Sequence, residues 1–148
     1  MILFFSEIQF KLSQKRPVKN WLSAIAKQEN KKIGEINIVF YNDEQLLALN
    51  KQYLNHDTFT DVITFDYSEG MFLHGDICIS IERVKENVKV FNCTFEEELH
   101  RVMAHGILHL CGYKDMKSAD KQIMKQKEES ALTLFNIQYS TFNTSYNY

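Results

Sequence analysis

Two histidines and an aspartate near residue 110 have the spacing of a metal-binding set. His105 and His109 are four residues apart, so on a helix both imidazoles lie on one face, one turn apart. Gly112 is suited to end that helix, because glycine adopts the left-handed conformation at low steric cost. The chain can then turn back and bring Asp115 to the same point. Two imidazole nitrogens and one carboxylate oxygen, with a position open for water, are typical of a catalytic divalent-metal site, above all of zinc.

The same spacing is similar to the extended zinc motif of metzincin peptidases, H-E-x-x-H-x-x-G-x-x-H, with aspartate in the third position. Those peptidases carry their general-base glutamate directly after the first histidine. Gly106 stands there in this chain, which argues against peptide hydrolysis by that route. A pair of histidines at this spacing also occurs on helices by chance; Gly112 and Asp115 at the right offsets favour a metal site over that explanation.

The residues before the histidines predict a buried helix that begins near Phe95. Thr94 and Glu97 form a capping-box pattern, and residues 96–98 place three carboxylates in the first turn. From Leu99 onward apolar residues recur at helical spacing, with few polar residues between them. We expect this helix to lie at the centre of the fold and to present both histidines.

The other segments alternate between strand-like and helical patterns. We predict an α+β fold with α/β-type layering: a single mixed sheet of about four strands, covered by helices, around the metal-binding helix. Residues 1–137 would form one domain, and the polar tail 138–148 is expected to be flexible. The predicted strands are residues 2–9, 36–41, 60–67 and 75–81, and the other predicted helices are 17–27, with proline at its first position, 42–53, 82–91 and 118–134.

Composition sets limits on the function. The chain has 148 residues, 45% hydrophobic and 24% charged, with a net charge of −2, as in an ordinary globular domain. Without a basic surplus, any RNA contact must come from a local patch. The apolar run at the N-terminus is too short for a signal peptide or a membrane span, and the three cysteines lack C-x-x-C spacing. We therefore expect a cytoplasmic protein with free thiols and no membrane contact.

Several further motifs stand in order along the chain. Residues 49–53 read L-N-K-Q-Y, residues 60–65 read T-D-V-I-T-F, residues 75–80 read G-D-I-C-I-S, and residues 95–98 read F-E-E-E, before H-G-I-L-H-L-C-G-Y-K-D over residues 105–115. In this order they resemble the motifs L-N-x-x-Y, T-D-V-L-S-F, G-D-I-x-I-S, F-E-E-E and H-G-x-L-H-L-x-G-Y-D-H of the YbeY-type endoribonucleases, also called ribosomal RNA maturation factors.

The resemblance implies a zinc-dependent endoribonuclease that prefers single-stranded RNA and acts in ribosomal RNA maturation and ribosome quality control. Ribosomal RNA and the small ribosomal subunit would be its partners, and one zinc ion would bind His105, His109 and Asp115. The family has histidine where this chain has Asp115, but a carboxylate oxygen is an acceptable zinc ligand. Two alternatives stay open. Asp115 could lie next to the ligands without binding the ion, with a different residue as the third ligand, and the ion could be another divalent metal such as nickel.

A second difference from the family pattern lies at Leu54, where the family carries an arginine after the tyrosine of L-N-x-x-Y. Phosphodiester cleavage benefits from a cation that neutralises charge developing on the phosphoryl oxygens. Candidates to replace the arginine are His56, Lys51 and Lys114, and His56 is also a candidate proton donor. Exposed residues without a catalytic role are the more common case for a histidine or lysine in such positions, so this alternative remains for His56 and Lys51.

Two aspartates in predicted strands leave a similar choice. Asp61 and Asp76 are flanked by apolar residues, so they could line the cleft and orient the second nitrogen of a histidine, or simply cap turns.

Two functions other than RNA cleavage also remain possible for the chain. One is a ribosome-assembly factor with a structural metal and little catalytic activity; the other is a metal-dependent peptidase or amidase, which Gly106 disfavours.

Overall fold

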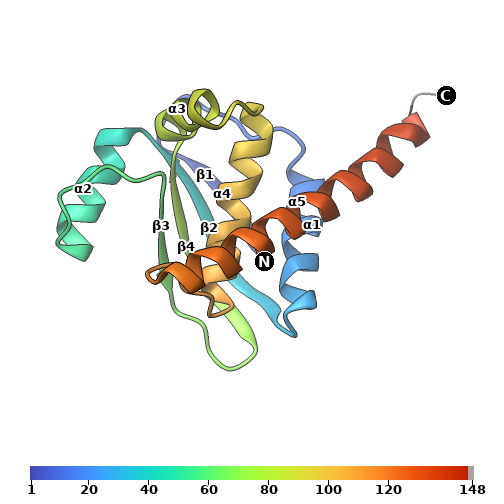
Figure 1. The fold of residues 1–148 in the computed structure, drawn as a ribbon, viewed down its shortest axis with the longest axis horizontal. Helices are drawn as coiled ribbons and strands as arrows, with labels where there is room; N and C mark the ends of the chain where they lie inside the picture. Colours follow the sequence, from blue (N-terminus) through green and yellow to red (C-terminus); the bar gives the residue numbers. More distant parts are fainter. Residues whose placement is uncertain (147–148) are drawn as a thin grey trace.

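The computed structural model describes the backbone of residues 1–146 and the side chains of residues 1–137. Four strands form one sheet in the order β1-β2-β4-β3, in which β1, β2 and β4 are parallel and β3 is antiparallel to β4 (Figure 1). The predicted α+β class with a single mixed sheet is confirmed. The elements are β1 (Ile2–Ser6), α1 (Lys15–Gln28), β2 (Lys32–Tyr41), α2 (Asp43–Leu54), β3 (Val62–Asp66), β4 (Phe72–Ser80), α3 (Ile81–Phe91), α4 (Phe95–Leu110) and α5 (Ser118–Tyr146).

Alternation along β4 gives the sheet two different faces. Ile77 and Ile79 join the main core, which α1, α4 and α5 complete, whereas Cys78 points to the other face. There it packs with Leu46 of α2 and Ile63 of β3 in a smaller cluster. Figure 1 accordingly shows α4 on one side of the sheet and α2 on the other. The central position predicted for the histidine helix is confirmed, since ten of its sixteen residues are buried.

Both ends of α4 follow from local sequence. At its start the Thr94 hydroxyl accepts a hydrogen bond from the Glu97 amide at 3.1 Å, although the reciprocal bond of a full capping box is not among those described. At its end Gly112 adopts a φ of 106°. The Gly112 amide donates to the His109 carbonyl at 3.0 Å, and the Tyr113 amide to the Leu108 carbonyl at 3.1 Å. This paired closure turns the chain sharply back toward the histidines.

Several boundaries differ from the sequence predictions. Helix α1 begins at Lys15, so Pro17 lies at its third position instead of its first; proline is tolerated there because the first amides of a helix have no partner within it. Helix α5 continues to Tyr146, well beyond the predicted end at Leu134. The side chains of residues 138–148 lie outside the described residues, so the flexibility of that tail stays a prediction.

Helix α5 is fastened along the helical face of the molecule by one buried residue of α1. The Trp21 indole nitrogen donates to the Ala131 carbonyl at 2.7 Å, and the Trp21 and Phe135 rings meet edge to face at 5.1 Å. Both contacts lie near the middle of α5, which also packs against α4. No helix in the described part of the chain has the length and apolar character needed to cross a membrane.

Candidate metal centre

The structure brings the three predicted ligands together. Oδ2 of Asp115 lies 3.2 Å from Nε2 of His105 and 3.3 Å from Nε2 of His109. The two imidazole rings are nearly perpendicular, with centroids 4.4 Å apart. Two ligands at about 2.05 Å from a tetrahedral ion are separated by about 3.3 Å, so the spacing of these donor atoms fits a zinc-sized ion. Among the described residues, this is the set of histidine, cysteine and carboxylate groups close enough to share a metal ion.

Hydrogen bonds on the other ring nitrogens prepare both histidines for a metal. Nδ1 of His109 lies 2.8 Å from the carbonyl oxygen of Tyr113. A carbonyl can only accept, so Nδ1 carries the hydrogen and the lone pair of Nε2 is free to bind an ion. Nδ1 of His105 lies 2.6 Å from Oε2 of Glu128 in α5, which has the same effect. Partners of this kind fix ring orientation and raise the basicity of metal-bound histidines.

The electrostatic field at the site favours a cation. Burial by itself lowers the pKa of His105, but the hydrogen bond and negative charge of Glu128, with the charges of Asp115 and Asp61, outweigh burial and raise it. Burial raises the pKa of Asp61, and the charge of His105 opposes that effect. The surroundings therefore attract positive charge to the place where the Nε2 atoms and Asp115 meet.

Glu128 is the residue that sequence reasoning missed. It takes the orienting role considered for Asp61 and Asp76, yet it belongs to no motif, and only the packing of α5 beside α4 brings it to His105. Asp61 does line the cavity, but it accepts a hydrogen bond from Asn87 at 3.2 Å instead of one from a histidine. The structure does not bring Asp76 to the site. It accepts from Asn37 at 3.0 Å on the opposite face of the sheet.

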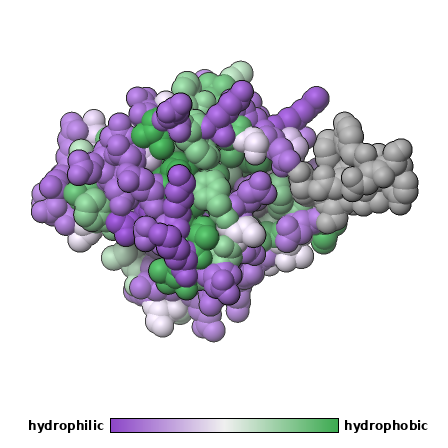
Figure 2. All heavy atoms as spheres, turned by 90° about the horizontal axis from the view of Figure 1, so that it is seen from above, coloured by the Kyte–Doolittle hydropathy of each residue, from purple (hydrophilic) through white to green (hydrophobic). Residues whose placement is uncertain are grey.

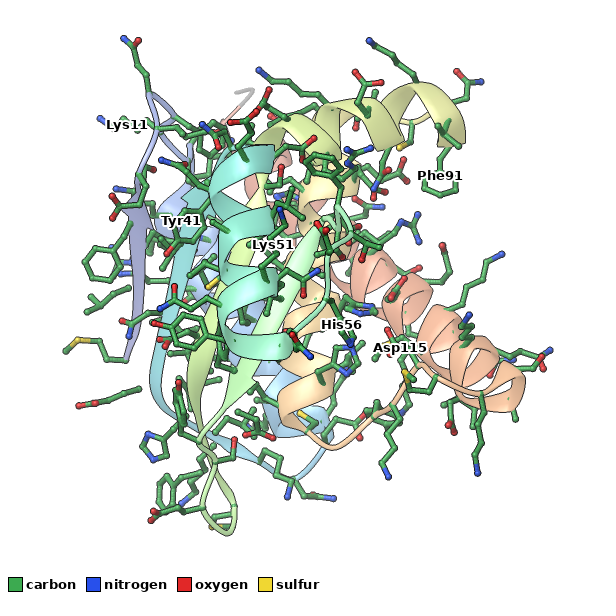
Figure 3. All side chains as sticks on the ribbon, turned by 90° about the vertical axis from the view of Figure 1, so that its left-hand side faces the viewer. Lys11, Tyr41, Lys51, His56, Phe91 and Asp115 are labelled. Atoms are coloured by element: carbon green, nitrogen blue, oxygen red, sulfur yellow. The ribbon has the colours of Figure 1, made fainter. Side chains whose placement is uncertain are left out.

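The three ligands lie in an open cavity of about 760 Å³. Its walls come from the end of α2, the loop of residues 55–61, β3, and the loop of residues 112–116. Figure 3 shows His56 and Asp115 approaching this space from different loops. His56 and Lys114 line the cavity, as does Leu54, but Lys51 does not; its Nζ pairs with Asp57 at 3.2 Å on the surface.

Close packing of α4 on the sheet explains why position 106 is a glycine. A Cβ at this position would come within 2.7 Å of Cγ2 of Ile77, so the absence of a side chain lets α4 pack directly on β4. The position after the first histidine thus faces the sheet and not the cavity. A glutamate there would meet β4 before it could reach the metal site. The geometry reinforces the argument against a metzincin-like peptidase.

The loop that carries Asp115 is tied to two helices. The Tyr113 hydroxyl donates to Glu29 at 2.7 Å, just after α1, and Lys127 of α5 donates to the same carboxylate at 2.9 Å. Burial tends to raise the pKa of Glu29, but these two hydrogen bonds lower it, so the carboxylate stays charged. Because the Tyr113 carbonyl also accepts from His109, this network supports the metal site from behind.

Comparisons with known proteins identify the family. The family model described as endoribonuclease YbeY matches residues 5–136. The chain belongs to this family. The protein named endoribonuclease YbeY from Flavobacterium psychrophilum is 55% identical over 137 residues, covering 93% of this chain and 98% of that one. The protein of the same name from Cytophaga hutchinsonii is 48% identical over 135 residues, covering 90% and 94% of the two chains.

A solved structure supports the same assignment. The solution structure of a Thermotoga maritima protein matches with a TM-score of 0.67 and 28% identity, over 95% of this chain and 93% of that one. The resemblance read from the motifs at residues 49–115 is therefore confirmed as family membership over most of the chain. The differences from the family motifs, as read from the sequence, include Lys114, Asp115 and Leu54.

Proposed function

We propose that this protein is a metal-dependent endoribonuclease that hydrolyses phosphodiester bonds in single-stranded RNA. One zinc ion would be held by His105, His109 and Asp115. The observation that carries the proposal is the convergence of three donor atoms, with both Nδ1 atoms already tied to acceptors, in an open cavity. Relatives named endoribonuclease YbeY, similar over nearly their whole length, support RNA as the substrate.

The donor set fits a catalytic ion because it supplies three ligands and leaves a coordination position for water or substrate. When bound, such an ion polarises a phosphoryl oxygen and lowers the pKa of water. Glu128 and the Tyr113 carbonyl keep both imidazoles in the tautomer that binds metal. Lys114, next to Asp115, lies where its charge can balance a phosphate that enters the cavity.

His56 has a separate place in this proposal. It lines the cavity from the loop after α2, and its backbone amide donates to the Asn50 carbonyl at 3.1 Å. An imidazole there can hold a proton close to the leaving oxygen of a bound strand, or place a positive charge beside the phosphate. It thus takes part of the role that the family arginine would have at Leu54.

The proposal extends to the biological setting. Ribosomal RNA as substrate, the small ribosomal subunit as partner, roles in rRNA maturation and ribosome quality control, and a cytoplasmic location are proposed from the motif resemblance. The competing function is an assembly factor with a structural metal, which Leu54 favours because it brings no cation to the cavity. Removal of the ion with a chelator distinguishes the two functions. Loss of a structural ion would unfold a protein that had no cleavage activity, whereas loss of a catalytic ion would abolish cleavage of RNA.

The test is cleavage of a defined RNA in single-stranded and duplex form by purified protein with zinc. We expect metal-dependent cleavage of the single strand that falls to background in His109→Ala. His74→Gln, which changes a histidine outside the cavity, should cleave like the parent protein. Circular dichroism would check that each variant is folded. Undiminished metal-dependent cleavage in the double variant His105→Ala/His109→Ala would rule out this assignment of the site.

A further inference from the structure

One large aromatic side chain at the cavity has no role in the proposed chemistry. Phe59 lines the cavity from the loop after α2, and 52% of its surface is exposed. A phenylalanine ring gains stability by leaving water, so an exposed ring in the wall of a cavity offers apolar surface to a ligand. Figure 2 shows that the face over α3 is mostly hydrophilic, with apolar residues gathered near its middle.

The Phe59 ring is supported from one side by a fixed cation. The guanidinium carbon of Arg83 lies 5.4 Å from the ring centroid. Arg83 is itself held, because its Nη2 donates to Asp43 at 2.8 Å, and the same carboxylate accepts from Ser80 at 2.6 Å. The ring therefore lies against a support built from the ends of β4 and the starts of α2 and α3.

The backbone on both sides of Phe59 is also fastened. Asn50, a buried residue of α2, donates from its side chain to the Thr58 carbonyl at 2.8 Å. On the other side the Ser80 amide donates to the Asp61 carbonyl at 2.9 Å. Since neighbouring backbone and the supporting cation are all held in place, the exposed ring is a preorganised flat surface and not a loose loop residue.

The rest of the rim shows which ligand fits this surface. Leu54 and Met116 are exposed apolar side chains on the same cavity, while Lys114 supplies a positive charge beside the metal ligands. An apolar rim around a polar, cation-binding floor matches a nucleotide, whose base is flat and whose phosphate is anionic. Every base has a π-face, so stacking on an aromatic ring tolerates any sequence.

We propose that Phe59 is a stacking platform for one unpaired base next to the phosphate that is cleaved. The proposal rests on the proposed RNA-cleaving function and adds the residue that selects the state of the strand. A base in a duplex is already stacked and paired, so it reaches the ring only after it leaves the helix. The platform would thus favour single strands without reading their sequence.

Equilibrium binding of short single-stranded RNA tests the platform. The zinc-loaded full-length protein would be titrated into a fluorescent oligonucleotide with a phosphorothioate backbone, which resists cleavage, so that binding is measured on the metal-bound protein. A series of oligonucleotides would carry one abasic nucleotide at successive positions. We expect one position at which removal of the base weakens binding to the parent protein about tenfold, the usual size of a base–aromatic contact.

The variants decide whether that penalty belongs to Phe59. In Phe59→Ala the intact RNA should bind about tenfold more weakly and the abasic penalty should vanish, whereas Phe59→Trp should keep the penalty. Phe72→Ala is the matched control, because the Phe72 ring is 46% exposed, lies 6.0 Å from the Lys32 ammonium and is outside the cavity. It should bind both RNAs like the parent protein.

Three results would overturn the platform: an unchanged abasic penalty in Phe59→Ala, no sensitive position in the parent protein, or no binding of single-stranded RNA. A parallel cleavage assay with zinc on the same preparations keeps the two proposals apart. Lack of cleavage with an intact Phe59-dependent penalty would refute the catalytic proposal alone. Cleavage together with an abasic penalty that is the same in Phe59→Ala and the parent protein would refute only the platform.

Discussion

The two histidines owe their readiness for a metal to what lies on their far sides. Each Nδ1 meets an acceptor, Glu128 for His105 and the Tyr113 carbonyl for His109, so both Nε2 lone pairs point toward Asp115. The triad itself could be predicted, because helical periodicity and a glycine stop are local properties of sequence. Glu128 could not be predicted in this way, since its position depends on how α5 packs.

Removal of Glu128 tests this orienting role. Glu128→Ala should lower zinc affinity by about 10- to 100-fold, the usual effect of losing a partner of a metal-bound histidine. Glu128→Gln should lose less zinc affinity, because the amide oxygen of glutamine can still accept a hydrogen bond from Nδ1 of His105. The neighbouring variant Glu129→Ala, which removes a partner of Arg101, is the control. Competition with a fluorescent chelator gives the affinities, and equal affinity in Glu128→Ala and the parent protein would refute the role.

A buried histidine outside the site links stability to pH. His100 lies against Trp21 and Phe135, and burial lowers its pKa to about 4. Above pH about 6.5 it is neutral in both states; below that the unfolded chain binds the proton first, so the folded state loses stability down to pH about 4. The loss attributable to His100 should reach roughly 3 kcal/mol.

Urea unfolding between pH 7 and pH 4 measures this loss. His100→Phe, which cannot titrate, should show a smaller fall in the free energy of unfolding over the same range. The carboxylates and the remaining histidines titrate in both proteins, so the difference between the two curves of unfolding free energy against pH isolates His100. Parallel curves would show that His100 does not carry the effect.

At the scale of elements, the loop after α4 is a tethered turn. Gly112 reverses the chain, and Tyr113 then joins it to Glu29 at the end of α1. The turn was predictable from a single glycine. The tether was not, because Tyr113 and Glu29 are 84 residues apart in sequence. The end of α5 was less predictable than its start: the helix continues to Tyr146, past the predicted end at Leu134, because a polar stretch gives no apolar repeat to mark where a helix ends.

Loss of the Tyr113 hydroxyl tests the tether. Tyr113→Phe should destabilise the protein by about 1 kcal/mol, a typical hydrogen bond, and weaken zinc binding severalfold by loosening the carbonyl that holds His109. Tyr67→Phe removes an exposed hydroxyl elsewhere and is the control. Thermal unfolding with and without zinc reports both effects. A variant as stable as the control, with unchanged affinity, would contradict the tether.

For the whole molecule, alternating strand and helix patterns predicted a single mixed sheet, and the structure and family comparison confirm it. The order β1-β2-β4-β3 and the face of each helix were beyond the sequence pattern, because they depend on long-range pairing. This arrangement explains why Asp76 is remote from the site although Asp61 is at its wall. Asp76 lies on the face of β4 opposite to that of Ile77, whereas Asp61 directly precedes β3 at the wall of the cavity.

The extent of the domain gives a test at this scale. Phe135 is the last buried side chain in the described part of the chain, so a protein ending at Ile137 should retain the core. We expect its melting temperature to lie within about 2 °C of the full chain, at most about 1 kcal/mol for a domain of this size, with unchanged zinc affinity. A drop of many degrees would show that residues 138–148 belong to the folded domain.

The proposed function depends on one catalytic ion bound by His105, His109 and Asp115 together. Anomalous scattering from zinc-loaded crystals, measured on both sides of the zinc absorption edge, tests it most directly. We expect one peak within bonding distance of both Nε2 atoms and an Asp115 oxygen, with a further coordination position open toward the cavity. A peak elsewhere, a closed site with four protein ligands, or an ion that leaves Asp115 unbound would contradict it.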